Sequence, residues 1–168
     1  KSLGAALEAL GAQVGGPGAL FAAAFITDAL DHARFPRAGF CGLMLPVLED
    51  ATLARRAAGG GLALSDLLLY AAVCGVGLDT VPLPGDVAEA TLTGILLDTA
   101  ALSARLRKPL VARLMPLPGL AAGDATSFSF EYFAPGGVMR VPAGEVGRPL
   151  AGSGPVDLAV YRAWANQL

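Results

Sequence analysis

The chain has 168 residues, of which 54% are hydrophobic and 15% are charged, and its formal net charge is −2. This composition excludes an intrinsically disordered protein, which needs low hydrophobicity and high net charge. The sequence contains no long basic run, so binding to nucleic acid through neutralised phosphates is not expected. Because few charges are available to cover the surface, we expect part of the apolar surface to be covered by the remainder of a longer protein or by another subunit.

The most apolar run, residues 62–81, does not have the composition of a membrane span. It contains Ser65, Asp66 and Asp79, whereas a spanning helix needs about 20 predominantly apolar residues with few or no charges. We therefore expect a buried core and no membrane partner. Two cysteines this far apart in the sequence form neither a zinc motif nor a disulfide framework, which favours a cytoplasmic protein with reduced thiols.

Hydrophobic periodicity and helix breakers predict the elements of the first third of the chain. Leucines and alanines at helical spacing predict a helix over residues 2–10, at the very start of the chain, from which we expect this to be the C-terminal part of a longer protein. A second helix is predicted over residues 19–33. Residues 40–47 form a short apolar run typical of a buried strand. Glu49-Asp50 then opens a short helix, which the glycines at 59–61 close.

The middle of the chain predicts a helix, a strand and a longer helix in succession. Ser65 is a candidate N-cap for a helix over residues 66–74, and residues 78–83 are expected to form a strand. Asp86 begins an Asp-Val-Ala-Glu sequence that resembles a capping box, and the apolar stripe behind it continues to Leu106.

The last third predicts extended segments. We expect strands over residues 110–115, over 128–132, where aromatic and polar residues alternate, and over 138–141. Residues 143–168 are expected to form a loop followed by a terminal helix. Strands that alternate with helices predict an α/β fold with a mostly parallel sheet or part of an α/β barrel, in a single unit over residues 1–168.

Four carboxylates flank the predicted strands and form the strongest candidate site. Glu49 and Asp50 follow one strand, Asp79 begins the next, and Asp86 follows its end. Ligands of parallel α/β folds collect at the carboxyl ends of strands, where these oxygens could hold Mg²⁺ or act as acid and base. Arg113 could pair with one of them or with an anionic ligand. The alternatives are structural: a helix cap for Asp86, a helix-dipole role for Glu49 and Asp50, and an ion pair for Arg113.

The cysteines and the histidine give weaker signals. Cys74 stands beside two glycines, either as a thiol presented to a cavity or as a small buried hydrophobic residue. Cys41, inside the apolar run, is expected to be structural. His32, at a predicted helix end, is expected to be a surface residue. The glycines after Cys74 do not form a dinucleotide loop, because Thr80 occupies the place of the third glycine.

Three segments of the chain, in this order, resemble the domain of unknown function 711 family, also catalogued as uncharacterised protein family 0210. They are residues 39–50, residues 72–86 (AVCGVGLDTVPLPGD), and residues 111–119, with residues 132–141 as a further matching end. The middle segment is the most specific of them.

The resemblance implies a longer protein with an α/β barrel-like fold similar to that of the pyruvate formate-lyase group of glycyl radical enzymes. A radical mechanism is not expected, because residues 140–144 lack the tyrosine and the spacing of the radical loop. The family supplies no established activity. The open hypotheses are an enzyme-like protein that binds a small anionic or metal-linked ligand at the strand ends, a non-catalytic ligand-sensing or assembly protein, and a purely structural half-barrel. The candidates on matched segments are Cys74 and Asp79 for catalysis, and Asp86, Arg113, Glu49 and Asp50 for ligand binding.

Overall fold

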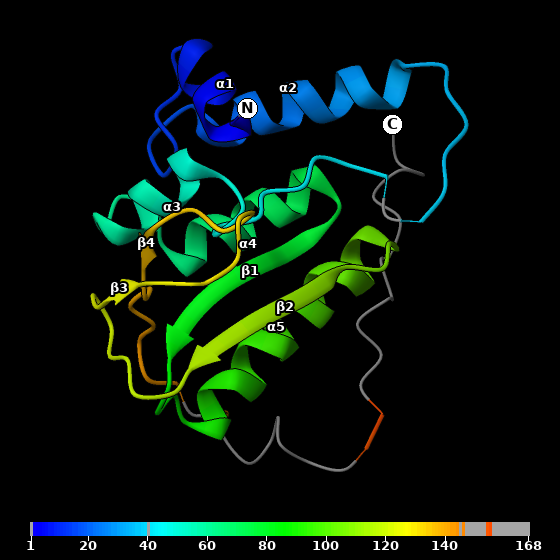
Figure 1. The fold of residues 1–168 in the computed structure, drawn as a ribbon. Coiled ribbons are helices and arrows are strands. Elements are labelled where there is room, and N and C mark those ends of the chain that lie inside the picture. Colours follow the sequence, from blue (N-terminus) through cyan, green and yellow to red (C-terminus); the bar gives the residue numbers. More distant parts are fainter. Residues whose placement is uncertain (1, 40, 145, 147–153, 156–168) are drawn as a thin grey trace.

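The computed structural model describes residues 2–39, 41–144, 146 and 154–155. The helix predicted at the end of the chain, over residues 156–168, lies outside them. The described part has an α/β fold, as the sequence predicted (Figure 1). Its elements in chain order are α1 (Leu3–Ala9), α2 (Ala19–His32), α3 (Ala51–Ala58), α4 (Leu64–Cys74), β1 (Gly77–Pro84), α5 (Glu89–Leu106), β2 (Val111–Leu117), β3 (Ala125–Thr126) and β4 (Gly136–Gly137).

The parallel pair of β1 and β2 forms the centre of the fold, and α5 provides the crossover that parallel strands need (Figure 1). On the other side of β1, Pro46 makes a single parallel bridge to Asp79. The short strands β3 and β4 pair antiparallel in a separate ribbon. Within the described residues no further strand pairs with β2, and the strands do not close into a barrel.

Two predicted helix starts are wrong. Helix α4 begins earlier than expected, with Ala63 as its N-cap, and the Asp66 carboxylate accepts the Ala63 N–H at 2.8 Å. Ser65 therefore lies inside the helix. Helix α5 begins at Glu89 after an extended Ala88, and no side chain caps it. Asp86 instead lies exposed in the turn that follows β1. The helix begins three residues later, at Glu89, so Asp86 is not at its N-cap position.

The segment predicted as a strand over residues 40–47 is extended only in part. Three residues alternate toward the core, namely Leu43, Leu45 and Val47. The segment forms no continuous ladder, and its single bridge is the one at Pro46. A proline has no N–H to donate, which limits the ladder that this run can form. The sequence pattern thus predicted the burial of Leu43, Leu45 and Val47 correctly, but Met44 is exposed and the strand does not form.

The strand predicted over residues 128–132 is also wrong, because this segment turns back on itself. The ring of Phe133 contacts those of Phe128 and Phe130 at centroid distances of 5.0 and 4.9 Å, in edge-to-face geometry. The Phe133 N–H donates to the Phe130 carbonyl at 3.1 Å, which closes the turn. The alternating aromatics therefore gather in one loop, which we call the aromatic loop (residues 128–133), instead of lining one face of a strand.

Residues 138–141, predicted as a strand, are not one either, although they are tied to the sheet. Val138 and Met139 are both buried. The Met139 N–H donates to the Pro82 carbonyl of β1 at 2.9 Å, and the Val138 N–H donates to the Asp124 carbonyl at the same distance. The Val138 carbonyl also accepts the Gly123 N–H at 2.9 Å, so three bonds to two segments hold these residues without a regular ladder.

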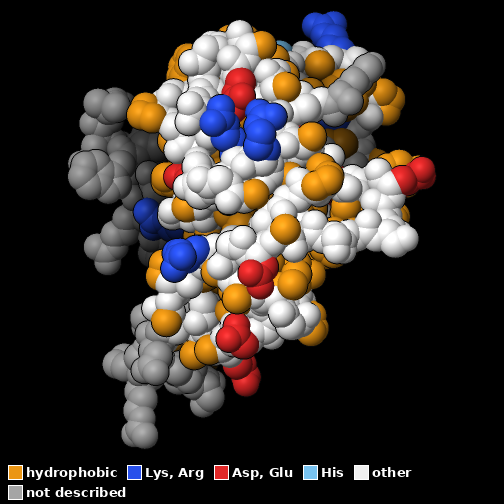
Figure 2. Space-filling view, turned by 60° about the vertical axis from the view of Figure 1, so that its left-hand side comes forward, with side chains coloured by type: hydrophobic (Ala, Val, Ile, Leu, Met, Phe, Trp, Pro, Cys, Tyr) orange, Lys and Arg blue, Asp and Glu red, His pale blue; other side chains and the backbone are white. Residues whose placement is uncertain are grey.

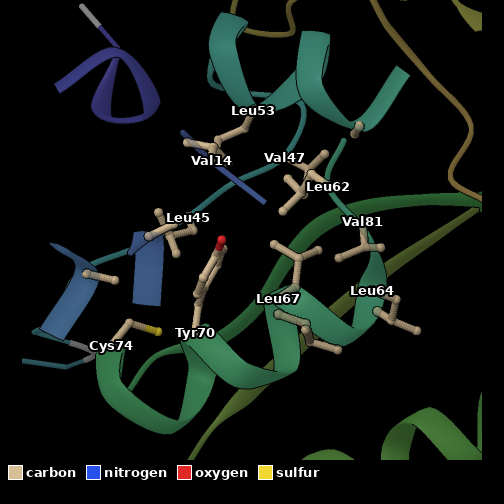
Figure 3. Close-up of a cluster of buried hydrophobic side chains, with 14 of the residues drawn as sticks. Val14, Leu45, Val47, Leu53, Leu62, Leu64, Leu67, Tyr70, Cys74 and Val81 are labelled. Atoms are coloured by element: carbon tan, nitrogen blue, oxygen red, sulfur yellow. The ribbon is translucent and has the colours of Figure 1, made fainter. Parts of the chain in front are cut away.

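The hydrophobic core lies between α4, α2, α3 and β1 (Figure 3). Tyr70 of α4 projects into it and is buried. The Tyr70 hydroxyl accepts the Gly15 N–H at 2.9 Å, which gives this buried polar group a hydrogen-bond partner. Val81 of β1 and Leu53 of α3 are fully buried in the same cluster. This packing fixes β1 against the helices and so determines which of its side chains can reach the surface.

The surface carries few charges. The face drawn in Figure 2 shows small, separate groups of acidic and basic side chains among hydrophobic and uncharged surface. Several large apolar side chains are exposed, among them Phe21, Phe25 and Leu69. The helices of the described part include none that is both long enough and apolar enough to cross a membrane. The expectation that another segment or subunit covers part of this surface stays a prediction.

Candidate functional site

A bulge in β1 creates the candidate site. Leu78 pairs with Ala112 and Val81 pairs with Leu114, so two residues of β1, Asp79 and Thr80, lie opposite the single residue Arg113 of β2. Bulges locally twist a strand and redirect its side chains, and they are frequent beside active sites. This irregularity places an acidic residue of one strand next to a basic residue of the other.

Arg113 joins two carboxylates that come from distant parts of the chain. Its Nε donates to Oδ1 of Asp79, and its Nη2 donates to Oε1 of Glu49 at 2.7 Å. We call these three residues the Arg113 cluster. The Asp79 side chain is 1% exposed, that of Glu49 is 35% exposed and that of Arg113 is 51% exposed. The cluster therefore runs from the interior to the surface.

Asp79 is the electrostatically unusual member of this cluster. Its second oxygen, Oδ2, is buried and has no hydrogen-bond partner among the described residues. Burial raises the pKa of Asp79, and the attraction and hydrogen bond of Arg113 oppose this rise without cancelling it; the negative charge of Glu49 adds to it. A carboxylate with a raised pKa and a free oxygen can accept a proton or a hydrogen-bond donor at this position.

Thr80, the second residue of the bulge, holds a strained backbone. Its φ is 45°, in the left-handed region that β-branched residues rarely adopt. Such a conformation costs of order 1–3 kcal/mol and persists where the surrounding structure enforces it, often at functional sites. Here Oγ1 of Thr80 accepts the Leu48 N–H at 3.1 Å, which ties the bulge to the segment that carries Glu49.

A pocket of about 480 Å³ opens beside the Arg113 cluster. The aromatic loop closes one side of it and is anchored by the Ala134 N–H, which donates to the Leu48 carbonyl at 2.7 Å. Leu48 therefore holds both the bulge and the aromatic loop in place. The pocket is lined by Glu49, Thr80, Ala112, Arg113, Leu114, Met115, Phe130 and Phe133.

The site brings together three of the residues that the sequence singled out. Glu49, Asp79 and Arg113 are in direct contact, through the ion pairs given above. Within the described residues no group of three or more histidines, cysteines or acids is arranged to hold a metal ion. Of the four carboxylates predicted to hold Mg²⁺, two meet at this position, and Arg113 bonds to both of them.

Asp50, next to Glu49 in the chain, points elsewhere. Its Oδ1 accepts the N–H groups of Thr52 and Leu53 at 2.9 and 3.1 Å, and it caps α3. Ser2 and Gly4 of the N-terminal segment also donate to this buried carboxylate. Burial would raise the pKa of Asp50, but the four hydrogen bonds outweigh it and hold the pKa below its ordinary value. The structure thus gives Asp50 the helix-terminal role that the sequence left as the alternative.

Asp86 and Cys74 also lie apart from the cluster. Asp86 lines a separate hollow beyond the carboxyl ends of β1 and β2, beside Gly119. Cys74 is 1% exposed and packs in the core with Tyr70 and Leu45 (Figure 3). Cys41 is partly exposed and donates through its Sγ to the Ala38 carbonyl at 3.0 Å.

Of the residues that line the pocket, the sequence singled out only Glu49 and Arg113 as site residues; Thr80, Phe130 and Phe133 are among those it did not. In the sequence, Thr80 stood out only because it occupies the place of the third glycine of a dinucleotide-binding motif. The two phenylalanines belong to the alternating pattern interpreted as a strand. The many aromatic residues between 128 and 133 were a sequence signal for a binding surface. They do not indicate that this segment lies beside Glu49 and β2.

Replacing Asp79 with asparagine is expected to change how stability depends on pH. Because the folded-state pKa of Asp79 is raised, its contribution is fully present below the unfolded pKa, about 3.9, and is lost as pH rises through the folded value. Wild type should therefore lose stability relative to Asp79→Asn as pH rises from 4 to 7, measured by urea unfolding. Asp98→Asn, on the exposed side of α5, is the control. A pH-independent difference for Asp79→Asn would contradict the prediction.

Comparison with known protein families agrees with the resemblance seen in the sequence. The family model described as "Uncharacterised ACR (DUF711)" matches residues 1–131, which include the whole Arg113 cluster. The chain belongs to the DUF711 family. The matched range also contains the bulge and the phenylalanine at position 130.

Among the DUF711 relatives is a UPF0210 protein of Pyrobaculum arsenaticum, 44% identical over 128 residues, which cover 73% of this chain and 29% of that protein. A UPF0210 protein of Lacticaseibacillus paracasei is 36% identical over 144 residues, which cover 83% and 32% respectively. The chain thus spans less than a third of the length of these curated relatives. No solved structure matches the chain significantly.

Proposed function

We propose that this chain binds a small molecule in the pocket beside the Arg113 cluster, with Asp79 as the group that receives its proton or hydrogen bond. The observation that carries this proposal is the buried Oδ2 of Asp79, which has no hydrogen-bond partner in the described part of the chain and lies next to a strained bulge. Buried polar groups in native proteins are nearly always paired, so such an oxygen calls for a partner. The adjacent pocket, of about 480 Å³, has the size of a small-ligand site.

Arg113 lies between Asp79 and the pocket in this proposal. Asp79 is fully buried, whereas Arg113 lines the pocket and keeps half of its side chain exposed. A ligand that shifts the guanidinium toward Glu49 would reach the carboxylate of Asp79. The raised pKa of Asp79 would then suit it to exchange a proton with the ligand, which is the contribution of a general acid or base. A non-catalytic sensing role would use the same contacts without the proton transfer.

The proposal can be tested by titrating small polar aromatic fragments into the ¹⁵N-labelled chain. We expect binders to shift the amide signals of Thr80, Arg113 and Phe133. Phe130→Ala, which removes a half-exposed ring from the pocket, should weaken these binders at least fivefold. Asp98→Asn should leave their affinity unchanged. If fragments at millimolar concentration leave the pocket signals in place, or if Phe130→Ala binds them equally well, the pocket is not a ligand site.

We further propose that this unit forms part of an α/β barrel similar to the pyruvate formate-lyase group in the longer DUF711 proteins. The parallel β1-α5-β2 arrangement supports this, as does the outer edge of β2, with which no described strand pairs. Parallel sheets are normally buried on both faces and extend over more strands. A cytoplasmic location is proposed with it, since both cysteines are free thiols.

A further inference from the structure

The charges around the pocket are unbalanced. Two carboxylates, those of Glu49 and Asp79, share one guanidinium, that of Arg113. Neither a second arginine nor a lysine lines the described pocket, and Glu49 and Arg113 are its charged lining residues. With both acids ionised, the cluster therefore carries one unneutralised negative charge.

An anionic ligand fits this arrangement poorly. The Nε and Nη2 groups of Arg113 already donate to carboxylates, so an anion would have to displace one of them. It would then lie beside two groups of its own charge, which is unfavourable in a partly desolvated site. The sequence left open an ion pair of Arg113 with one acid or an anionic ligand, whereas the structure pairs Arg113 with two acids.

The remaining lining of the pocket is mostly aromatic and apolar. Phe130 and Phe133 pack edge to face, with centroids 4.9 Å apart and planes at 86°. Leu114 and Met115 of β2 also line the pocket. The π-face of a phenyl ring attracts cations, most strongly where water is excluded, and the carbon atoms around it hold an apolar body.

We propose that the ligand of this pocket is an organic cation, an amine or a quaternary ammonium with an apolar body. Its charge would be met by the carboxylate of Glu49, which lines the pocket, and would be attracted at longer range by the buried carboxylate of Asp79; its body would contact Phe130 and Phe133. This inference rests on the proposed function, and it replaces the anionic ligand with a positively charged one.

The experiment uses a set of probes that share a benzyl body: benzyltrimethylammonium and benzylamine as cations, phenylacetate as the anion, and benzyl alcohol as the neutral analogue. Each is titrated into the ¹⁵N-labelled chain of 168 residues, with the signals of Thr80, Arg113 and Phe133 as the readout. We expect the cations to bind at least tenfold more tightly than the anion and the neutral analogue.

Two variants test the role of charge. Glu49→Gln and Asp79→Asn should each lower the affinity for the cations at least fivefold and leave the affinity for benzyl alcohol unchanged. Asp98→Asn should change neither affinity. Glu49 is partly exposed, so its variant keeps the test valid if Asp79→Asn unfolds. Tighter binding of phenylacetate, or equal binding of all probes at these residues, would overturn the inference and leave the ligand site intact. Absence of binding by every probe would overturn both.

Discussion

Gly77→Ala should destabilise the protein by about 3 kcal/mol or more, since strain and overlap act together at this position. The φ of Gly77 is 111°, which side chains rarely adopt, and a methyl group there would overlap the Val111 carbonyl oxygen and lie 2.7 Å from the Val111 nitrogen. These are backbone atoms of β2, and the Val111 N–H donates to the Val76 carbonyl at 2.8 Å. Relief of the overlap would therefore require the start of the β1-β2 pairing to open.

Urea unfolding followed by circular dichroism measures this effect. The matched control is Gly119→Ala, where φ is 80° but no atom lies within 4 Å of the added methyl group. That variant should lose only the strain contribution, about 1–2 kcal/mol. Equal losses for the two variants would show that the close approach of β1 to β2 is not the cause. Gly77→Ala should also lower the affinity of the pocket for its ligand, because the bulge at Asp79 and Thr80 follows two residues later in the same strand.

Asp50→Ala should lower the free energy of unfolding by about 3 kcal/mol, because it leaves buried donors without an acceptor. The Asp50 carboxylate accepts the Ser2 hydroxyl at 2.8 Å and the Gly4 N–H at 3.1 Å, in addition to the two N–H groups of α3 that it caps. It therefore holds the segment of α1 against the start of α3. The side chain is 4% exposed, so water cannot replace these bonds without local unfolding.

The pH dependence of this effect has a definite sign. Because hydrogen bonds hold the folded pKa of Asp50 below its ordinary value, the stabilisation is present above the unfolded pKa, about 3.9, and is lost as pH falls through the folded value. The difference between wild type and Asp50→Ala should thus shrink in acid. Glu49→Gln, at the neighbouring exposed carboxylate, should cost less than about 1 kcal/mol. A small loss for Asp50→Ala together with lost ligand binding would return Asp50 to the list of site residues.

Most helices and the two main strands could be predicted from local pattern. Helix α2 was expected over residues 19–33 and spans Ala19–His32, and β1 was expected over residues 78–83 and spans Gly77–Pro84. These elements depend on residue periodicity and on glycines or prolines at their ends, which are properties of neighbouring residues. The strand predicted over residues 40–47 failed at a distant contact, the single bridge of Pro46 to Asp79, whereas the start of α4 was set by the neighbouring Asp66.

The sequence predicted which types of residue form the candidate site, but not which of the candidate carboxylates belong to it. Glu49, Asp79 and Arg113 were all singled out, and the structure joins them. Asp50 and Asp86 had equal standing in the sequence, yet one caps a helix and the other lies in the turn after β1. Carboxylates look alike in a sequence, and only burial and donor geometry separate a structural one from an unpartnered one.

The sequence by itself determined the α/β class, the order of the main elements and membership of the DUF711 family, because these follow from composition, periodicity and the segment over residues 72–86. Only the tertiary structure decided that β1 bulges at Asp79 and Thr80 and that Arg113 lies opposite. Strand register depends on how β1 packs against the helices and β2 together, and residues 34 positions apart in the chain meet only through that packing.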